Sequence, residues 1–66
     1  RNHFFMTRRD LIRHLESYGC EFLREGGKHT VYVNRREMKV TTIPRHREVD
    51  QKLSYKICKD LGVPKP

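Results

Sequence analysis

The sequence lacks any long hydrophobic run, and it is short. Its 66 residues contain no apolar stretch that approaches the ~18 residues of a membrane-spanning helix. A domain of this size buries only about 60% of the surface that its unfolded chain exposes, and 35% of the residues are hydrophobic. These features exclude a multidomain enzyme, a large cofactor pocket and a membrane-spanning segment, and we expect no membrane partner. We expect one small domain over residues 1–66.

Cysteine is scarce as well. Cys20 and Cys58 lie far apart in the chain, form no C-x-x-C pair and have no histidine at zinc-finger spacing. Because both adjoin apolar positions, we interpret them as buried, reduced thiols; a single bridge in a secreted mini-domain is the alternative. Phe4 to Met6 is too short for the apolar region of a signal peptide, so we expect a cytoplasmic protein. We interpret residues 1–5 as a disordered tail or an upstream remnant.

Acidic residues are few, with 8 Asp and Glu against 15 Lys and Arg, and the net charge is +7. Residues 1–25 hold five basic and four acidic residues, and residues 48–66 hold four and three. Residues 26–47 hold one acid, Glu37, and six basic residues, for a net charge of +5: Lys28, Arg35, Arg36, Lys39, Arg45 and Arg47. A localised positive excess favours a polyanionic partner. We therefore interpret residues 26–47 as the electrostatic face, with an incidental solvated surface as the alternative.

Helix signals stand at both ends of the chain. A capping pattern formed by Thr7 and Asp10 precedes apolar residues at helical spacing, and Gly19 follows them; the spaced residues are Leu11, Ile12, Leu15 and Tyr18. These features predict a helix over residues 8–18. Steps of four from Val49 to Leu61, through Leu53 and Ile57, predict a second helix over residues 48–61, which Gly62 ends.

Strand signals fill the middle of the chain. Residues 20–25, with Phe22 as the core anchor, and residues 28–33 flank the turn at Gly26-Gly27 and predict a hairpin. A third strand over residues 38–43 ends at Pro44, which cannot donate to a ladder. We therefore expect an α+β fold of order α-β-β-β-α, with a three-stranded antiparallel sheet, both helices on one face and the other face open.

Two of the four histidines stand near turns and basic residues. His29 follows Gly26-Gly27-Lys28, where the glycines let the backbone approach a ligand closely and Lys28 adds a charge. His46 closes the string Ile43-Pro44-Arg45-His46-Arg47. The spacing alone favours an edge histidine at His29 and an exposed basic loop at His46 over functional roles. His3 and His14 are most simply solvated.

The sequence offers no supported nucleophile–base pair, no catalytic pair of carboxylates, no phosphate-binding loop and no metal ligand set; Glu48 and Asp50 are best explained as acids of a first helical turn. A catalyst would therefore work with histidine, lysine and arginine. Ribonuclease chemistry suits this set, because RNA supplies its own 2′-hydroxyl nucleophile. Histidine can move the proton, and the cations can bind the phosphate. We expect no metal and no cofactor.

Four segments, in register between Met6 and Pro64, resemble the HicA family of toxins: T-R-R-D-L-I-R-H-L-E-S-Y-G-C, G-G-K-H-T-V-Y, V-T-T-I-P-R-H and I-C-K-D-L-G-V-P. The resemblance implies a fold like the double-stranded RNA-binding domain and an RNA-cleaving toxin, an mRNA interferase, that a HicB-type antitoxin holds inactive. It places the family's catalytic Gly-x-His at Gly27-Lys28-His29 and its Pro-x-His string at Pro44-Arg45-His46. Many members carry Gly-Thr-Leu in the second helix where this chain has Lys52-Leu53-Ser54, which we interpret as a subgroup difference.

We therefore predict that His29 is the general base toward a ribose 2′-hydroxyl and that His46 is a candidate second proton donor. The predicted RNA-binding residues are Gly27, Lys28, Lys39, Arg45 and His46. An acidic antitoxin over residues 26–47 would block the substrate and neutralise charge together. One alternative is a non-catalytic RNA-binding module of the same fold, against which the acids Glu48 and Asp50 argue. Another is a small DNA-binding or protein-interaction partner.

Overall fold

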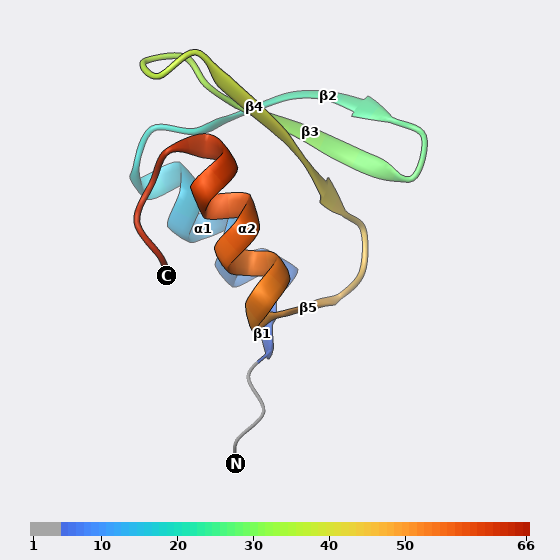
Figure 1. Ribbon diagram of the computed structural model, residues 1–66. Helices are drawn as coiled ribbons and strands as arrows, with labels where there is room; N and C mark the ends of the chain where they lie inside the picture. The colour runs from blue at the N-terminus through green and yellow to red at the C-terminus, as the bar shows by residue number, and fades with distance from the viewer. Residues whose placement is uncertain (1–4) are drawn as a thin grey trace.

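The fold is a three-stranded sheet with two helices on one face, and the computed structural model describes residues 5–66 of it (Figure 1). In chain order the elements are β1 (Phe5–Thr7), α1 (Arg8–Ser17), β2 (Glu21–Gly26), β3 (His29–Asn34), β4 (Lys39–Pro44), β5 (Glu48–Asp50) and α2 (Gln51–Leu61). The main sheet is antiparallel in the order β2-β3-β4. The predicted α+β class, three-stranded sheet and placement of the helices are confirmed. The predicted tail lies outside the described residues, apart from Phe5, which begins β1.

A second, two-stranded sheet was not predicted. β1 pairs antiparallel with β5, and Met6 lies opposite Val49. The second helix consequently starts three residues later than predicted, at Gln51, because Asp50 adopts an extended conformation and its side chain caps the helix by accepting from the Leu53 amide at 2.8 Å. Val49 is still buried. The spacing of four therefore predicted its burial correctly but its conformation wrongly.

The first helix has the predicted start and an earlier end. Thr7 caps it by accepting from the Asp10 amide at 3.0 Å, as the capping pattern predicted. Its last residue is Ser17, and the left-handed φ of +89° at Gly19 turns the chain into β2. Tyr18 is therefore not part of the buried stripe: it lies past the helix end, is 49% exposed and packs its ring against His14.

The core lies between the helices and the covered face of the sheet. Its buried residues come from both helices, the strands and the loop before β2: Leu11, Leu15, Cys20, Tyr32, Ile43, Val49, Ile57, Cys58 and Leu61. Both cysteines are free and buried, as expected. Phe22 was wrongly predicted as the core anchor of its strand: it is 52% exposed, with its ring edge-on to Tyr32, because β2 is an edge strand while α2 packs on β4.

Within the described part of the chain, no helix combines the length and the hydrophobicity needed to cross a membrane.

Candidate functional site

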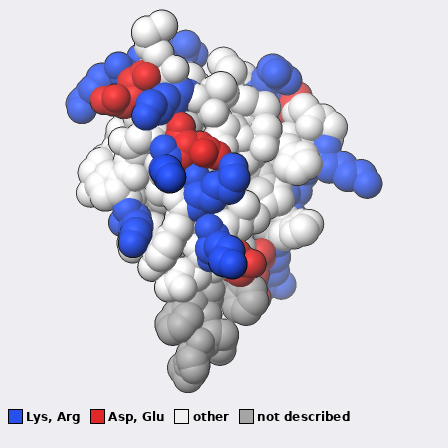
Figure 2. All heavy atoms as spheres, viewed as in Figure 1, with Lys and Arg blue, Asp and Glu red and all other residues white. Residues whose placement is uncertain are grey.

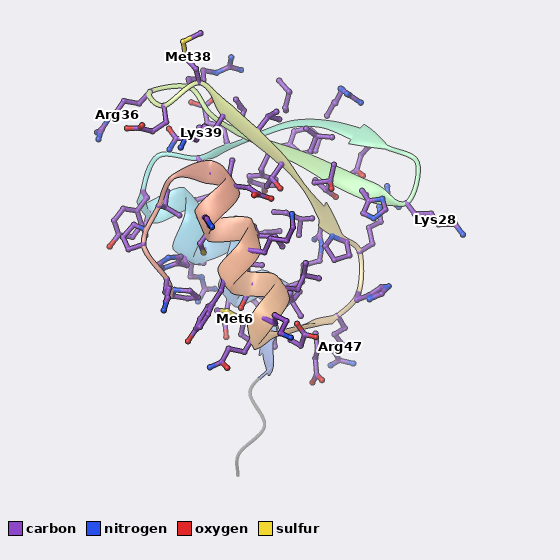
Figure 3. All side chains as sticks on the ribbon, viewed as in Figure 1. Met6, Lys28, Arg36, Met38, Lys39 and Arg47 are labelled. Carbon is purple, nitrogen blue, oxygen red and sulfur yellow. The ribbon has the colours of Figure 1, made fainter. Side chains whose placement is uncertain are left out.

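The register of the sheet gathers most of the predicted site residues at one end, which we call the hairpin end. His29, the first residue of β3, lies between Gly26 on one side and Pro44 on the other. The turn of Gly27 and Lys28 precedes it, and Arg45 and His46 follow Pro44 directly. In Figure 3, Lys28 extends from the tip of the β2–β3 turn. Five of the six predicted residues therefore belong to this end: Gly27, Lys28, His29, Arg45 and His46.

His29 is exposed on the open face of the sheet. Side chains alternate along a strand, and Tyr32 of β3 belongs to the core under the helices. His29 and Val31 therefore face the other way, toward the side that the helices leave uncovered. Gly27 has a left-handed φ of +62°, which explains why a glycine stands in this turn. A side chain that can exchange protons is thus presented at the surface with its backbone fixed on both sides.

A cation that was missing from the sequence-based site lies beside His29. Gly26 is the cross-strand partner of His29 and shares its face. A Cβ placed on Gly26 would lie 3.2 Å from Nη1 of Arg24 and 3.8 Å from Val31. The missing side chain at Gly26 thus leaves room for the Arg24 guanidinium to lie next to the histidine position. The sequence does show Arg24 two residues before Gly26, but the face on which the Arg24 side chain lies depends on a β-bulge between Phe22 and Arg24.

On the helix side of the same end, Arg45 is already engaged. Its guanidinium forms an ion pair with Glu25, and the two side chains are 51% and 48% exposed. Hydrogen bonding by Arg45 lowers the pKa of the Glu25 carboxyl below its ordinary value, and the smaller contribution of Thr30 acts in the same direction. Arg45 is therefore oriented by Glu25, and its partner is accessible from solvent.

A buried hydroxyl connects this ion pair to the first helix. Thr30 donates to the Glu25 carboxylate at 3.2 Å and accepts from Nη2 of Arg8 at 2.6 Å. Nε of Arg8 donates to the Pro44 carbonyl at 3.1 Å. Polar contacts thus join α1 to β3 and β4, and through Thr30 to Glu25 of β2. Arg8, Glu25 and Thr30 were not predicted as part of this group, because the contacts of Arg8 and Arg45 join positions 20 or more residues apart in the chain.

Lys39 is not brought to this end. It pairs with Asn34, five residues along β3 from His29, which corresponds to about 17 Å at ~3.4 Å per residue. Its Cδ lies 3.4 Å from the position that a Cβ on Gly62 would take, beside the end of α2. Figure 3 shows Lys28 and Lys39 at opposite ends of the sheet. The physical reason is that β3 carries the chain away from the hairpin end, so that Lys39, the first residue of β4, follows the turn at the far end of the sheet.

The same turn divides the basic segment 26–47, so the single electrostatic face that we expected does not form. Lys28 and Arg45 belong to the hairpin end, whereas Arg35 and Arg36 lie in the turn, next to Lys39. Arg47 directly precedes β5, where its carbonyl accepts from the Arg8 amide. Arg35 also pairs with Glu21 at 3.2 Å. Figure 2 shows lysines and arginines spread over the visible face with acids between them. The site must therefore be defined by side chains near His29 and not by the sum over the segment.

The remaining histidines and acids form no comparable group. His14 is half-buried and donates from Nε2 to the Pro64 carbonyl at 2.8 Å, so it is not simply solvated. His3 lies outside the described residues. Across residues 5–66, no three His, Cys, Asp or Glu side chains stand close enough together to hold a metal ion.

The fold and the hairpin end together define a small, basic α+β protein that presents a histidine and several cations at one end of an open sheet. Residues 8–63 match the family model described as the HicA toxin of bacterial toxin–antitoxin systems. The chain therefore belongs to the HicA toxin family. No curated protein and no solved structure matches it. The likeness to the double-stranded RNA-binding domain consequently stays a prediction.

Proposed function

We propose that this toxin is an endoribonuclease that cleaves mRNA with His29 as general base and is neutralised by a HicB-type antitoxin. The observation that carries the proposal is the position of His29. It is exposed, its backbone is held between Gly26 and Pro44, and its neighbours include the Arg24 guanidinium. A histidine held in this way can accept a proton near neutral pH.

RNA cleavage of this kind requires only a general base and a proton donor from the protein. His29 takes the proton of a ribose 2′-hydroxyl, and the 2′-oxygen attacks the adjacent phosphorus. The bond from phosphorus to the 5′-oxygen breaks, which leaves a 2′,3′-cyclic phosphate on one product and a 5′-hydroxyl on the other. The leaving 5′-oxygen must gain a proton, and His46 is our candidate donor, because it follows the strand end that pairs with His29.

The cations of the hairpin end bind the phosphate and the negative charge that develops on it. Lys28 directly precedes His29, the Arg24 guanidinium lies against Gly26, the cross-strand partner of His29, and the open turn at Gly27 leaves room for the substrate. An ion pair as exposed as that of Arg45 with Glu25 contributes little to stability. A phosphate can therefore replace Glu25 as the partner of Arg45. Lys39, at the far end, would contact only RNA that is remote from the cut.

We expect the antitoxin to neutralise the toxin by covering the same surface. An acidic face of a HicB-type antitoxin over the hairpin end would exclude RNA and pair with these cations together. We expect both proteins to act in the cytoplasm, where mRNA is translated.

The test compares wild type, His29→Ala and His29→Gln on unmodified RNA, with His14→Gln as the matched histidine control outside the hairpin end. General-base catalysis contributes about 10²–10⁴-fold, so both His29 variants should lose at least about a hundredfold in kcat while His14→Gln retains cleavage. Circular dichroism checks that each variant is folded. Cleavage should continue in a chelator, and a deoxynucleotide at the cut should block it.

Two results would contradict the proposal. Wild-type rates in a folded His29→Ala would remove the histidine from the mechanism. RNA that binds wild type but is never cut would instead favour the non-catalytic RNA-binding module.

A further inference from the structure

An open groove runs along the first helix, on the side where the 44–47 segment meets it. Four arginines line it, Arg8, Arg9, Arg13 and Arg47, together with two acids, Asp10 and Glu16. The groove therefore carries a net charge of +2 from its own lining. It was not singled out in the sequence, because the segment that contains α1 is close to neutral overall.

Three of the four arginines of the groove are available for a ligand, whereas the Arg8 side chain is engaged by Thr30 and Pro44. Arg9, Arg13 and Arg47 are exposed, and among the described residues none of them forms an ion pair within 4.0 Å, although Asp10 and Glu16 are nearby. Arg9 and Arg13 stand one helical turn apart, about 6 Å along the axis. Like charges at this spacing weaken a helix. The pair therefore contributes nothing evident to the fold.

The groove is continuous with the hairpin end. The Arg8 amide donates to the Arg47 carbonyl at 2.8 Å, and the Arg8 side chain reaches the Pro44 carbonyl. Arg47 follows His46 directly. Figure 3 shows Arg47 on the segment that leaves β4, well away from Arg36 at the other end of the sheet. An RNA strand that is bound at the hairpin end can therefore continue along α1.

We propose that this groove binds the phosphate backbone of RNA to one side of the cut, as an extension of the site. The inference rests on the proposed function for its substrate. Guanidinium groups match phosphate oxygens with two parallel hydrogen bonds. Ile12 is the only hydrophobic residue among the described residues that line the groove, whereas protein interfaces depend on apolar and aromatic anchors. The lining therefore favours a nucleic acid backbone over an acidic protein.

The test measures binding of a 2′-O-methyl oligoribonucleotide, which the proposed chemistry cannot cleave. The full chain is compared with Arg9→Gln/Arg13→Gln, and fluorescence anisotropy gives Kd over a salt series. Each lost phosphate contact lowers the slope of log Kd against log salt by about 0.7 for single strands, so the double variant should lose about 1.4. We take the two phosphate contacts to contribute nothing near ~1 M salt. The slope difference of about 1.4 then makes the double variant bind about 25-fold more weakly than wild type at ~0.1 M salt.

The matched control is Arg36→Gln/Lys59→Gln, which removes the same charge from exposed positions outside the groove. It should shift Kd by less than about threefold. Equal Kd values and slopes for the two double variants would overturn the proposal that the groove binds RNA. The same result is expected if the ligand of the groove is an acidic protein. Failure of wild type to bind would overturn the groove and the proposed function together. Groove-dependent binding without cleavage of unmodified RNA would overturn catalysis and leave the groove standing.

Discussion

The guanidinium of Arg8 donates from Nη2 to the hydroxyl of Thr30 at 2.6 Å, and this contact joins the start of α1 to the middle strand of the sheet. Thr30 is 2% exposed, and its hydroxyl donates in turn to the Glu25 carboxylate. Every buried polar side-chain atom in the described residues has a hydrogen-bond partner. The hairpin end is consequently fixed by a satisfied polar network where the hydrophobic core ends.

Removing the hydroxyl of Thr30 should therefore destabilise the protein without changing its shape. Thr30→Val leaves the half-buried Arg8 guanidinium without one partner, which costs about 1–3 kcal/mol. The exposed Glu25 carboxylate can bond to water instead. Urea unfolding should show a loss of that size. The matched control is Thr42→Val, an exposed threonine opposite Val31 on the other face, which should change stability by less than about 0.5 kcal/mol. Equal losses in the two variants would show that the network contributes nothing.

Arg24 should contribute to RNA cleavage, given the proposed function. A charge-assisted hydrogen bond to phosphate contributes about 1.5–3 kcal/mol, so Arg24→Gln should lower kcat/KM at least about tenfold. Gly26→Ala should have a similar effect at nearly full stability, because the one tight contact of its new Cβ, at 3.2 Å, would be with the flexible end of Arg24, and Val31 at 3.8 Å lies at an ordinary distance. Steady-state cleavage assays measure both, with Arg36→Gln as the control. Wild-type kinetics in Arg24→Gln would contradict the assignment.

Features that depend on residues close together in the chain could be predicted from the sequence, whereas features that depend on distant residues could not. Caps at Thr7 and Gly62 were predictable because capping is decided within a few residues. The pairing of Met6 with Val49 was not, because strands of three residues carry no readable periodicity and their partners lie far apart. A charge count over residues 26–47 could not show that an antiparallel turn separates Lys39 from His29.

Arg24 illustrates the other limit. Its place beside His29 depends on a bulge in β2 and on the space over Gly26, neither of which local patterns reveal. His29 itself was proposed through a motif, since its surroundings in the sequence suggested only an edge histidine. The helices and the main sheet could thus be predicted from local signals, whereas the β1–β5 pairing and the composition of the candidate site depend on the register.

The two thiols should be unreactive in the native protein. Burial raises the pKa of Cys20 and of Cys58 above their ordinary values, and only the thiolate reacts with disulfide reagents. Ellman's reagent at mildly alkaline pH should therefore label neither cysteine until denaturant is added, when both should react. The unfolded protein is the internal control for reagent and stoichiometry. A rapid native-state reaction of one thiol would contradict the burial of that residue.

Asp60 should make stability depend on acid pH. Its Oδ2 accepts from Lys56 Nζ at 2.9 Å and from the Thr41 hydroxyl at 3.2 Å, which ties α2 to β4. Lys56 is the larger cause that lowers the pKa of this carboxyl below its ordinary 3.8. A lowered folded-state pKa stabilises the protein above the unfolded-state pKa, and the contribution is lost as pH falls through the folded-state value. Asp60→Asn should therefore lower Tm at neutral pH and converge with wild type below pH ~3.8.

The size of this effect is limited by solvent, because the Lys56 and Asp60 side chains are 68% and 35% exposed. We expect about 0.3–1 kcal/mol after screening. Lys56→Gln provides the control: it removes the larger cause of the shift, so the Tm of this variant should depend less on pH between neutral and acid conditions than that of wild type. If Asp60→Asn stays equally destabilised at the acid end of the titration, the shape of the side chain and not its charge ties α2 to β4.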